Sequence, residues 1–176
     1  MTLTILGSLL IAFSPQGGGQ ANPRVSIVVE NRGTMVAELF PNEAPKTVAR
    51  FVQLVKSGFY DGVRFHRVEN APRPFIIVAG DPLTKSLPIT DPKVGTGGTG
   101  TRLPFEKNNV QFLNGTLGLV RDVRDKDSGD CQFFICNGDQ RFLEHSYVGF
   151  GRVIQGLEVI PKVQVGDKIA TIRVVN

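Results

Sequence analysis

The stretch VSIVVENRGTMVAELF, residues 25–40, contains two short runs of β-branched and aliphatic residues separated by a turn. Val25–Glu30 and Met35–Phe40 flank the turn residues Asn31–Thr34, and this order predicts a β-hairpin. Similar short runs recur along the rest of the chain. Further strands are predicted at Val63–Val68, Phe75–Ala79, Thr116–Arg121, Gln132–Cys136, Val148–Val153 and Ile169–Val175.

One amphipathic helix is predicted directly after the hairpin, beginning near Pro45 and ending before Gly58. Gly156–Pro161 predicts one further short helical turn. The apolar residues of the first helix recur at the spacing i, i+3, i+4 and i+7, and they are Val48, Phe51, Val52 and Val55. Because helices do not alternate with the strands, the sequence predicts a mainly β fold, an antiparallel barrel or a sandwich.

The composition is typical of one globular domain. Of the 176 residues, 41% are hydrophobic and 20% are charged, which excludes a disordered chain. Lys and Arg number 20 against 16 Asp and Glu, but the basic residues are scattered, so no nucleic-acid partner is expected. No apolar run reaches the roughly 18 residues of a membrane span. We expect a monomer.

The cysteine and histidine content argues against a metal site and against a disulfide scaffold. The two His and two Cys do not have the spacing of zinc ligands. Cys131 and Cys136 are five residues apart in a predicted strand, so their Cα atoms would lie about 16 Å apart, too far for a disulfide. The sequence also lacks the common nucleotide-binding and nucleophile motifs. Neither a metal nor a cofactor is expected.

The N-terminal residues differ in character from the rest of the chain. Residues 1–21 contain no charged side chain, and the apolar run Leu3–Phe13 is followed by small and polar residues up to Ala21. This pattern resembles a secretory signal, although no Lys or Arg precedes the apolar run. We therefore expect residues 1–23 to be a signal peptide or an N-terminal extension, and residues 24–176 to be the folded domain. The expected location is periplasmic or otherwise exported, with a cytoplasmic location as the alternative.

A long connection at Asp81–Pro104 is rich in proline and contains the glycine cluster Gly95–Gly100. Connections of this length in a compact domain are usually functional or mobile. His66 lies in the predicted strand Val63–Val68, before this connection. We expect it to be a core histidine with a hydrogen-bonded ring.

Three further strings identify a family. They are GVRFHRV at 62–68, FIIVAGDP at 75–82 and DCQFFIC at 130–136. Together with PKT at 45–47 and YVGFGRV at 147–153, they resemble, in the same order, the cyclophilin family of peptidyl-prolyl cis–trans isomerases. The resemblance extends from Val25 to Val174 and is greatest to bacterial or organellar members. It implies an eight-stranded antiparallel barrel capped by two helices, acting on proline-containing peptides and unfolded proteins.

The resemblance also implies which residues form the site. Arg67, in the FHR string, matches the catalytic arginine of the family. Val120 and Arg121 take the places of an Ala-Asn pair whose backbone binds the residue before proline. The substrate-binding positions implied in this way are Phe75, Ile76, Val78, Val120, Arg121, Phe134, Phe142, Leu143 and Tyr147.

Some of these positions depart from the family pattern. Phe142 stands in for a tryptophan and loses the indole N–H, which predicts weakened binding of the family's cyclosporin-type inhibitor. Tyr147 replaces a histidine. Val78 replaces a glutamine that supports the arginine by hydrogen bonding, and a valine cannot do so. Two functions therefore remain: an isomerase of reduced activity, or a proline-peptide binding module or chaperone with little turnover.

The valine at position 78 predicts a loosely held Arg67, so that Val78→Gln would raise turnover. However, the loop between Arg67 and Phe75 is about three residues longer than usual for the family. If Asn70, Arg73 or another residue of this loop orients Arg67, the same substitution would be neutral or harmful, because it would bury an unpartnered amide.

Overall fold

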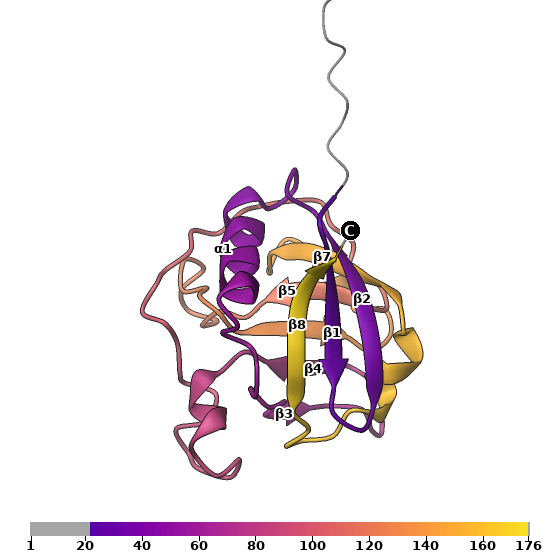
Figure 1. The fold of residues 1–176 in the computed structure, drawn as a ribbon. Coiled ribbons are helices and arrows are strands. Elements are labelled where there is room, and N and C mark those ends of the chain that lie inside the picture. Colours follow the sequence, from indigo (N-terminus) through magenta and orange to yellow (C-terminus); the bar gives the residue numbers. More distant parts are fainter. Residues whose placement is uncertain (1–21, 176) are drawn as a thin grey trace, which may run out of the picture.

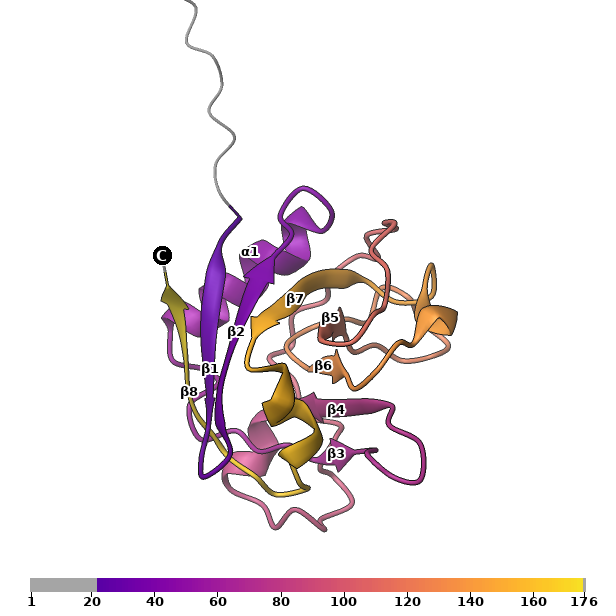
Figure 2. The same ribbon diagram turned by 90° about the vertical axis from the view of Figure 1, so that its right-hand side faces the viewer.

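A single curled antiparallel sheet forms the body of the protein. The computed structural model describes residues 22–175. Eight strands pair in the order β3-β4-β6-β5-β7-β2-β1-β8 (Figures 1 and 2). Their bounds are β1 Arg24–Val29, β2 Gly33–Leu39, β3 Arg67–Val68, β4 Ile76–Ala79, β5 Thr116–Leu119, β6 Phe133–Cys136, β7 Gly149–Gln155 and β8 Ile169–Val175. All the ladders are antiparallel, which confirms the predicted mainly β, eight-stranded fold.

The two edges of the sheet meet through the segment that precedes β3. The Gly62 N–H donates to the Ile169 carbonyl at 2.8 Å, and the Ile169 N–H donates to the Val63 carbonyl at 2.8 Å. The Phe65 N–H donates to the Asp167 carbonyl at 2.9 Å. The predicted strand at 63–68 is therefore shared between two partners. Its first part lies beside the start of β8, and only Arg67–Val68 pairs with β4.

Two helical segments cover the sheet. Helix α1 spans Pro45–Lys56, and the 3-10 segment η3 spans Leu157–Lys162, the gold coil in the lower half of Figure 2. Pro161 lies inside η3, where it cannot donate a backbone hydrogen bond, so this element remains short, as the sequence predicted. Two further 3-10 turns are η1, Pro82–Lys85, and η2, Arg141–Leu143.

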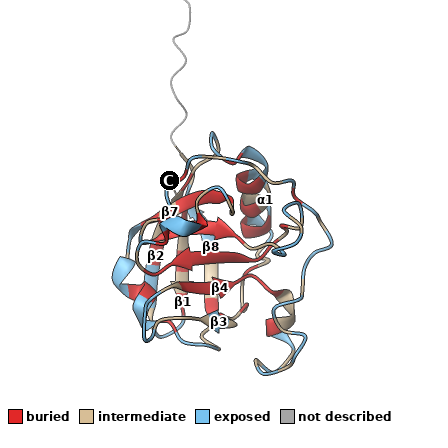
Figure 3. Cartoon of the chain, turned by 180° about the vertical axis from the view of Figure 1, so that it is seen from behind, coloured by how far each residue is buried: buried red, intermediate tan, exposed pale blue. Residues whose placement is uncertain are grey.

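The core follows the two periods expected of strands and helices. In β1 every second residue is buried, and the same alternation continues in β2 (Figure 3). The ring of Phe51 from α1 lies 5.2 Å from the Tyr60 ring, 5.5 Å from Phe133 and 5.1 Å from Phe150, measured between centroids. These rings join the helix to β6 and β7, and they fix the sheet from which the site is built.

A glutamate distant in the sequence caps the first turn of α1. The N-cap residue, Ala44, has no side chain that can cap the helix. Instead, the Glu106 carboxylate accepts the N–H of Lys46 at 2.8 Å and the N–H of Thr47 at 2.8 Å. It also accepts the Thr47 hydroxyl at 2.7 Å. A carboxylate at a helix N-terminus satisfies free N–H groups and interacts favourably with the helix dipole.

We therefore expect Glu106→Ala to lower the free energy of unfolding by about 1–2 kcal/mol, the usual loss when a helix cap is removed. Urea denaturation followed by circular dichroism measures this change. Lys107→Ala, one residue away on the exposed surface, is the matched control and should leave the midpoint unchanged. Equal midpoints for Glu106→Ala and the wild type would show that the cap is not important for stability.

The long connection after β4 is anchored by a buried carboxylate. Asp81 is fully buried, and its Oδ1 accepts the Leu83 N–H at 2.8 Å. Its Oδ2 accepts the N–H of Gly95 at 2.5 Å and that of Gly97 at 3.2 Å. A Cβ atom at Gly97 would overlap the Asp81 carboxylate, which explains why glycine is required there. The glycine cluster is therefore fixed against the barrel.

The structure bears differently on the predictions made for the N-terminal residues and for the two cysteines. The predicted signal peptide or extension at 1–23 falls almost wholly outside the described residues. Within residues 22–175 no helix is long and apolar enough to cross a membrane. Cys131 and Cys136 are both free and buried, and burial raises the pKa of each thiol to about 12.

Candidate functional site

An apolar pocket of about 180 Å³ lies over β3, β4 and β6. It is lined by Arg67, Phe75, Ile76, Val78, Val120, Arg121, Val123, Phe134, Leu143 and Tyr147. Nine of the ten site residues expected from the sequence thus line one pocket, and Phe142 is the exception. We refer to this cavity as the apolar pocket.

The floor of the apolar pocket is one transverse row of the sheet. Arg67 pairs with Val78, Val78 with Phe134, and Phe134 with Gly118, across β3, β4, β6 and β5. Directly paired residues point to the same face, so this register places the cation beside the apolar floor. A Cβ atom at Gly118 would overlap the Phe134 ring, so the glycine makes room for the aromatic floor.

The Phe134 ring is held on two sides. It stacks on Phe112 with a centroid distance of 5.8 Å and meets the edge of Tyr147 at 5.5 Å. Its side chain is almost fully buried, as are those of Ile76 and Leu143 in the same cluster. A floor that is already packed loses little side-chain entropy when a ligand binds.

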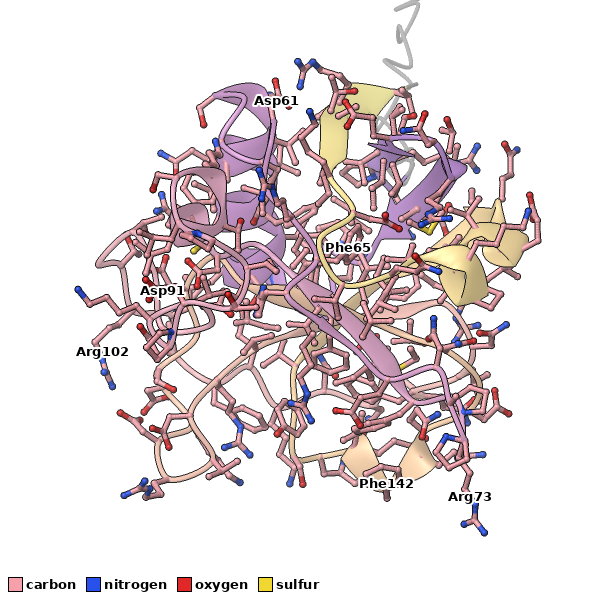
Figure 4. The ribbon with its side chains drawn as sticks, turned by 90° about the horizontal axis from the view of Figure 1, so that it is seen from below. Asp61, Phe65, Arg73, Asp91, Arg102 and Phe142 are labelled. Atoms are coloured by element: carbon pink, nitrogen blue, oxygen red, sulfur yellow. The ribbon has the colours of Figure 1, made fainter. Side chains whose placement is uncertain are left out.

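The rim of the apolar pocket carries two exposed hydrophobic side chains. Phe142 is 70% exposed and stacks on Phe75 at 5.6 Å, so it extends the wall outward without lining the pocket (Figure 4). Val123 is 74% exposed and lines the opposite part of the pocket. Sequence reasoning missed Val123. The one feature of the sequence that could have indicated Val123 is that it is a single aliphatic residue among charged neighbours.

Arg67 is held by a neighbour that the sequence analysis did not name. Its Nε donates to Oε1 of Glu69 at 2.6 Å, and its Nη2 lies 2.5 Å from the same oxygen. Residues two apart in an extended chain share a face, which explains the contact. Glu69 thus supplies the acceptor that Val78 lacks.

The two loop residues named as alternatives do not contact Arg67. The Asn70 side chain donates to the carbonyls of Pro161 at 3.2 Å and Val163 at 3.1 Å, and accepts from Asn137 at 2.8 Å. It ties the loop to η3. Arg73 points outward at the surface (Figure 4).

Arg121 also lines the apolar pocket. Its Nε donates to the Ser146 carbonyl at 2.9 Å, and its Nη1 donates to the Asp122 carbonyl at 2.8 Å. Its Cζ lies 4.7 Å from the centre of the Tyr147 ring. These contacts fix the plane of the guanidinium, and the cation over the ring is a favourable arrangement.

A larger polar groove of about 710 Å³ adjoins the apolar pocket. Val120 and Arg121 line both cavities, and the glycine-rich residues 95–100 form much of the far wall of the groove. The Gln132 amide donates to the carbonyls of Gly95 at 3.1 Å and Gly97 at 2.7 Å. The long connection thus has a structural use as the wall of a cavity. Among the described residues no cluster of His, Cys, Asp or Glu is placed to hold a metal ion.

His66 lies under the same wall. Its Nδ1 is buried and has no hydrogen-bond partner within residues 22–175, so the hydrogen bonding predicted for the ring is missing at this atom. Burial lowers the pKa of His66 below its ordinary value, against an opposing effect of the nearby Asp81 carboxylate. The folded protein therefore favours the neutral imidazole.

This shift has a consequence for stability. A histidine whose pKa is lower in the folded state binds protons more readily when unfolded, so the free energy of unfolding is expected to fall as the pH decreases below about 6.5. Urea titrations at pH 7.5 and 5.5 should show a smaller loss in His66→Asn than in the wild type. His145→Asn, at the exposed second histidine, is the control. An equal pH dependence in His66→Asn and the wild type would exclude His66 as its source.

Comparison with known proteins assigns the chain and its fold to a family. Residues 24–175 match the family described as cyclophilin type peptidyl-prolyl cis-trans isomerase/CLD. The chain belongs to this family. This cyclophilin is 36% identical over 153 residues to a peptidyl-prolyl cis-trans isomerase of Synechococcus elongatus, covering 86% of the chain and 96% of the relative. A peptidyl-prolyl cis-trans isomerase of Helicobacter pylori is 33% identical over 156 residues, covering 86% and 87%.

Solved structures agree with the sequence relatives. A cyclophilin type peptidyl-prolyl cis-trans isomerase of Cryptosporidium parvum superposes with a TM-score of 0.75 at 25% identity, covering 88% of this chain and 98% of that chain. The same protein solved in the presence of the dipeptide Ala-Pro gives a TM-score of 0.73 at 25% identity, covering 87% and 99%. By family and by these relatives, this cyclophilin is a peptidyl-prolyl cis–trans isomerase.

Proposed function

We propose that the apolar pocket holds the proline ring of an exposed Xaa-Pro segment while Arg67 stabilises the twisted peptide bond. The observation that carries this proposal is a guanidinium at the edge of a pocket whose floor is otherwise apolar. Three aromatic and three aliphatic side chains suit a pyrrolidine ring: Phe75, Phe134, Tyr147, Ile76, Val78 and Leu143. The relative crystallised in the presence of Ala-Pro supports a proline ligand.

The chemistry requires no nucleophile. Rotation about a peptide bond is slow because the nitrogen lone pair is delocalised into the carbonyl, with a barrier of about 18–20 kcal/mol. When the bond twists, the lone pair of the prolyl nitrogen becomes a hydrogen-bond acceptor. A donor directed at this nitrogen binds the transition state more tightly than either ground state, and therefore accelerates the reaction. A rate gain of about 10⁵ corresponds to about 7 kcal/mol.

In this mechanism Arg67 needs a fixed orientation as well as a charge. Its side chain is 58% exposed, so packing alone does not hold it. Two nitrogens shared with one oxygen of Glu69 fix the guanidinium plane and leave its remaining N–H groups for the substrate. The exposed ring of Phe142, stacked on the half-buried ring of Phe75, offers apolar contact for residues next to proline in unfolded clients.

Replacing Arg67 by Ala is expected to lower kcat/KM at least tenfold, because the donor to the prolyl nitrogen is lost. The fold should survive, since Arg67 is exposed and its one side-chain partner is Glu69. A protease-coupled assay with a proline peptide measures the rate, and circular dichroism checks the fold. Arg141→Ala, at an exposed arginine paired with Glu144, is the control. Unchanged catalysis in folded Arg67→Ala would contradict the mechanism. Peptide binding without acceleration by the wild type would support the binding-module alternative.

The role of Glu69 gives a separate test. Glu69→Ala should lower kcat about three- to tenfold, since an exposed ion pair of this kind contributes about 1 kcal/mol to the orientation of Arg67. Val78→Gln alone should leave the rate level or lower it, because Glu69 already holds Arg67 and the amide would enter an apolar pocket.

The double variant Glu69→Ala/Val78→Gln distinguishes orientation from folding. The new amide should recover part of the rate lost in Glu69→Ala, with KM little changed. A rise in turnover for Val78→Gln alone would instead mean that Arg67 is loosely held in the wild type.

A further inference from the structure

Arg121 stands at the boundary between the apolar pocket and the polar groove. A peptide whose proline occupies the apolar pocket must place a neighbouring residue beside this boundary. The Arg121 guanidinium is held there by the two backbone carbonyls of Ser146 and Asp122 and by the Tyr147 ring. Its position is therefore set before a ligand arrives.

The charge of Arg121 is not paired within the described residues. The other two arginines that line the cavities each have a carboxylate partner, Arg67 with Glu69 and Arg102 with Asp125. Between residues 22 and 175 no carboxylate forms an ion pair with Arg121, and its Nη2 has no hydrogen-bond acceptor there. A preorganised guanidinium with free N–H groups is suited to bind a carboxylate.

The carboxylates that line the groove are occupied by other donors. Asp130 accepts the N–H groups of Thr99, at 2.5 Å, and of Gly100, at 3.1 Å, and lies 3.9 Å from Arg50. Oδ1 of Asp122 accepts the Arg124 N–H at 2.8 Å. The negative charge of Asp130 disfavours an anion in the part of the groove that it lines, and among the arginines of the two cavities Arg121 is the one without a carboxylate partner in residues 22–175.

We propose that Arg121 selects peptides with an acidic side chain, Asp or Glu, immediately next to the proline. The proposal rests on the proposed function of the apolar pocket and names the substrate class that this pocket accepts. The acidic side chain would accept hydrogen bonds from the free edge of the guanidinium, while the proline ring remains on Phe134. The partly exposed pair would be weakened by salt.

The test compares isosteric peptides that differ by one charge. Acetyl-capped tetrapeptides carrying Glu or Gln immediately before proline, and a second pair with the same residues immediately after it, are followed by NMR exchange spectroscopy. The measured quantity is the ratio of kcat/KM for Glu over Gln. We expect a ratio of about five- to tenfold at one of the two positions at low salt, and a clear decrease in 0.5 M NaCl.

Variants assign the preference to Arg121. Arg121→Gln should bring the ratio to about one, and Arg121→Lys, which keeps the charge, should retain part of it. Arg24→Gln removes the same charge from the far end of the sheet and should leave the ratio unchanged.

A ratio of one at both positions in the wild type, or a ratio that survives Arg121→Gln, would overturn the proposal. Faster isomerisation of the Gln peptides in the presence of the protein tests the proposed function separately, because these peptides lack the acidic side chain. If none of the peptides is accelerated, the ratio of their affinities from NMR titration tests the selectivity in the same way.

Discussion

The closure of the sheet is the constraint on which the rest of the structure depends. Backbone hydrogen bonds join residues 62–65 to the beginning of β8, and the same segment continues directly into β3. Open sheet edges expose unpaired N–H and C=O groups, and closure removes them. It also leaves β3 only two residues long, so Arg67 lies where the chain has just changed its pairing partner. The position of Arg67 therefore depends on contacts with residues near the other end of the sequence.

The register of the sheet determines which side chains form the floor of the apolar pocket. Arg67, Val78, Phe134 and Gly118 come from four different strands, and strand pairing brings them into one row. A shift of one residue in any ladder would place a member of this row on the other face. Backbone pairing thus determines together the positions of the Arg67 charge, the Val78 side chain, the Phe134 floor and the space left by Gly118. The exposed side chains of the rim, Phe142 and Val123, come from segments outside the strands of the sheet.

Most of the fold was predictable from the sequence because it rests on local patterns. Alternating runs such as Val25–Glu30 identify strands, and the helical stripe around Phe51 identifies α1. The residues that line the apolar pocket were, apart from Val123, predictable from ordered motifs. The Glu69 contact was not, since a loop conformation decides which side chain reaches Arg67. The same holds for the Glu106 cap, because 60 residues separate it from Lys46, and for the unpartnered His66 Nδ1, because hydrogen bonding depends on tertiary packing.

The buried Asp81 carboxylate divides the long connection into two parts with different freedom. Its two oxygens hold Leu83 on one side and Gly95 on the other, so the intervening residues 84–94 leave and return at the same carboxyl group. The cost of lengthening a loop with fixed ends grows only with the logarithm of its length. Insertions between residues 86 and 94 would therefore leave the groove wall in place. The chain can acquire new residues in this segment without disturbing the groove wall, because the Asp81 carboxylate fixes both ends of the segment.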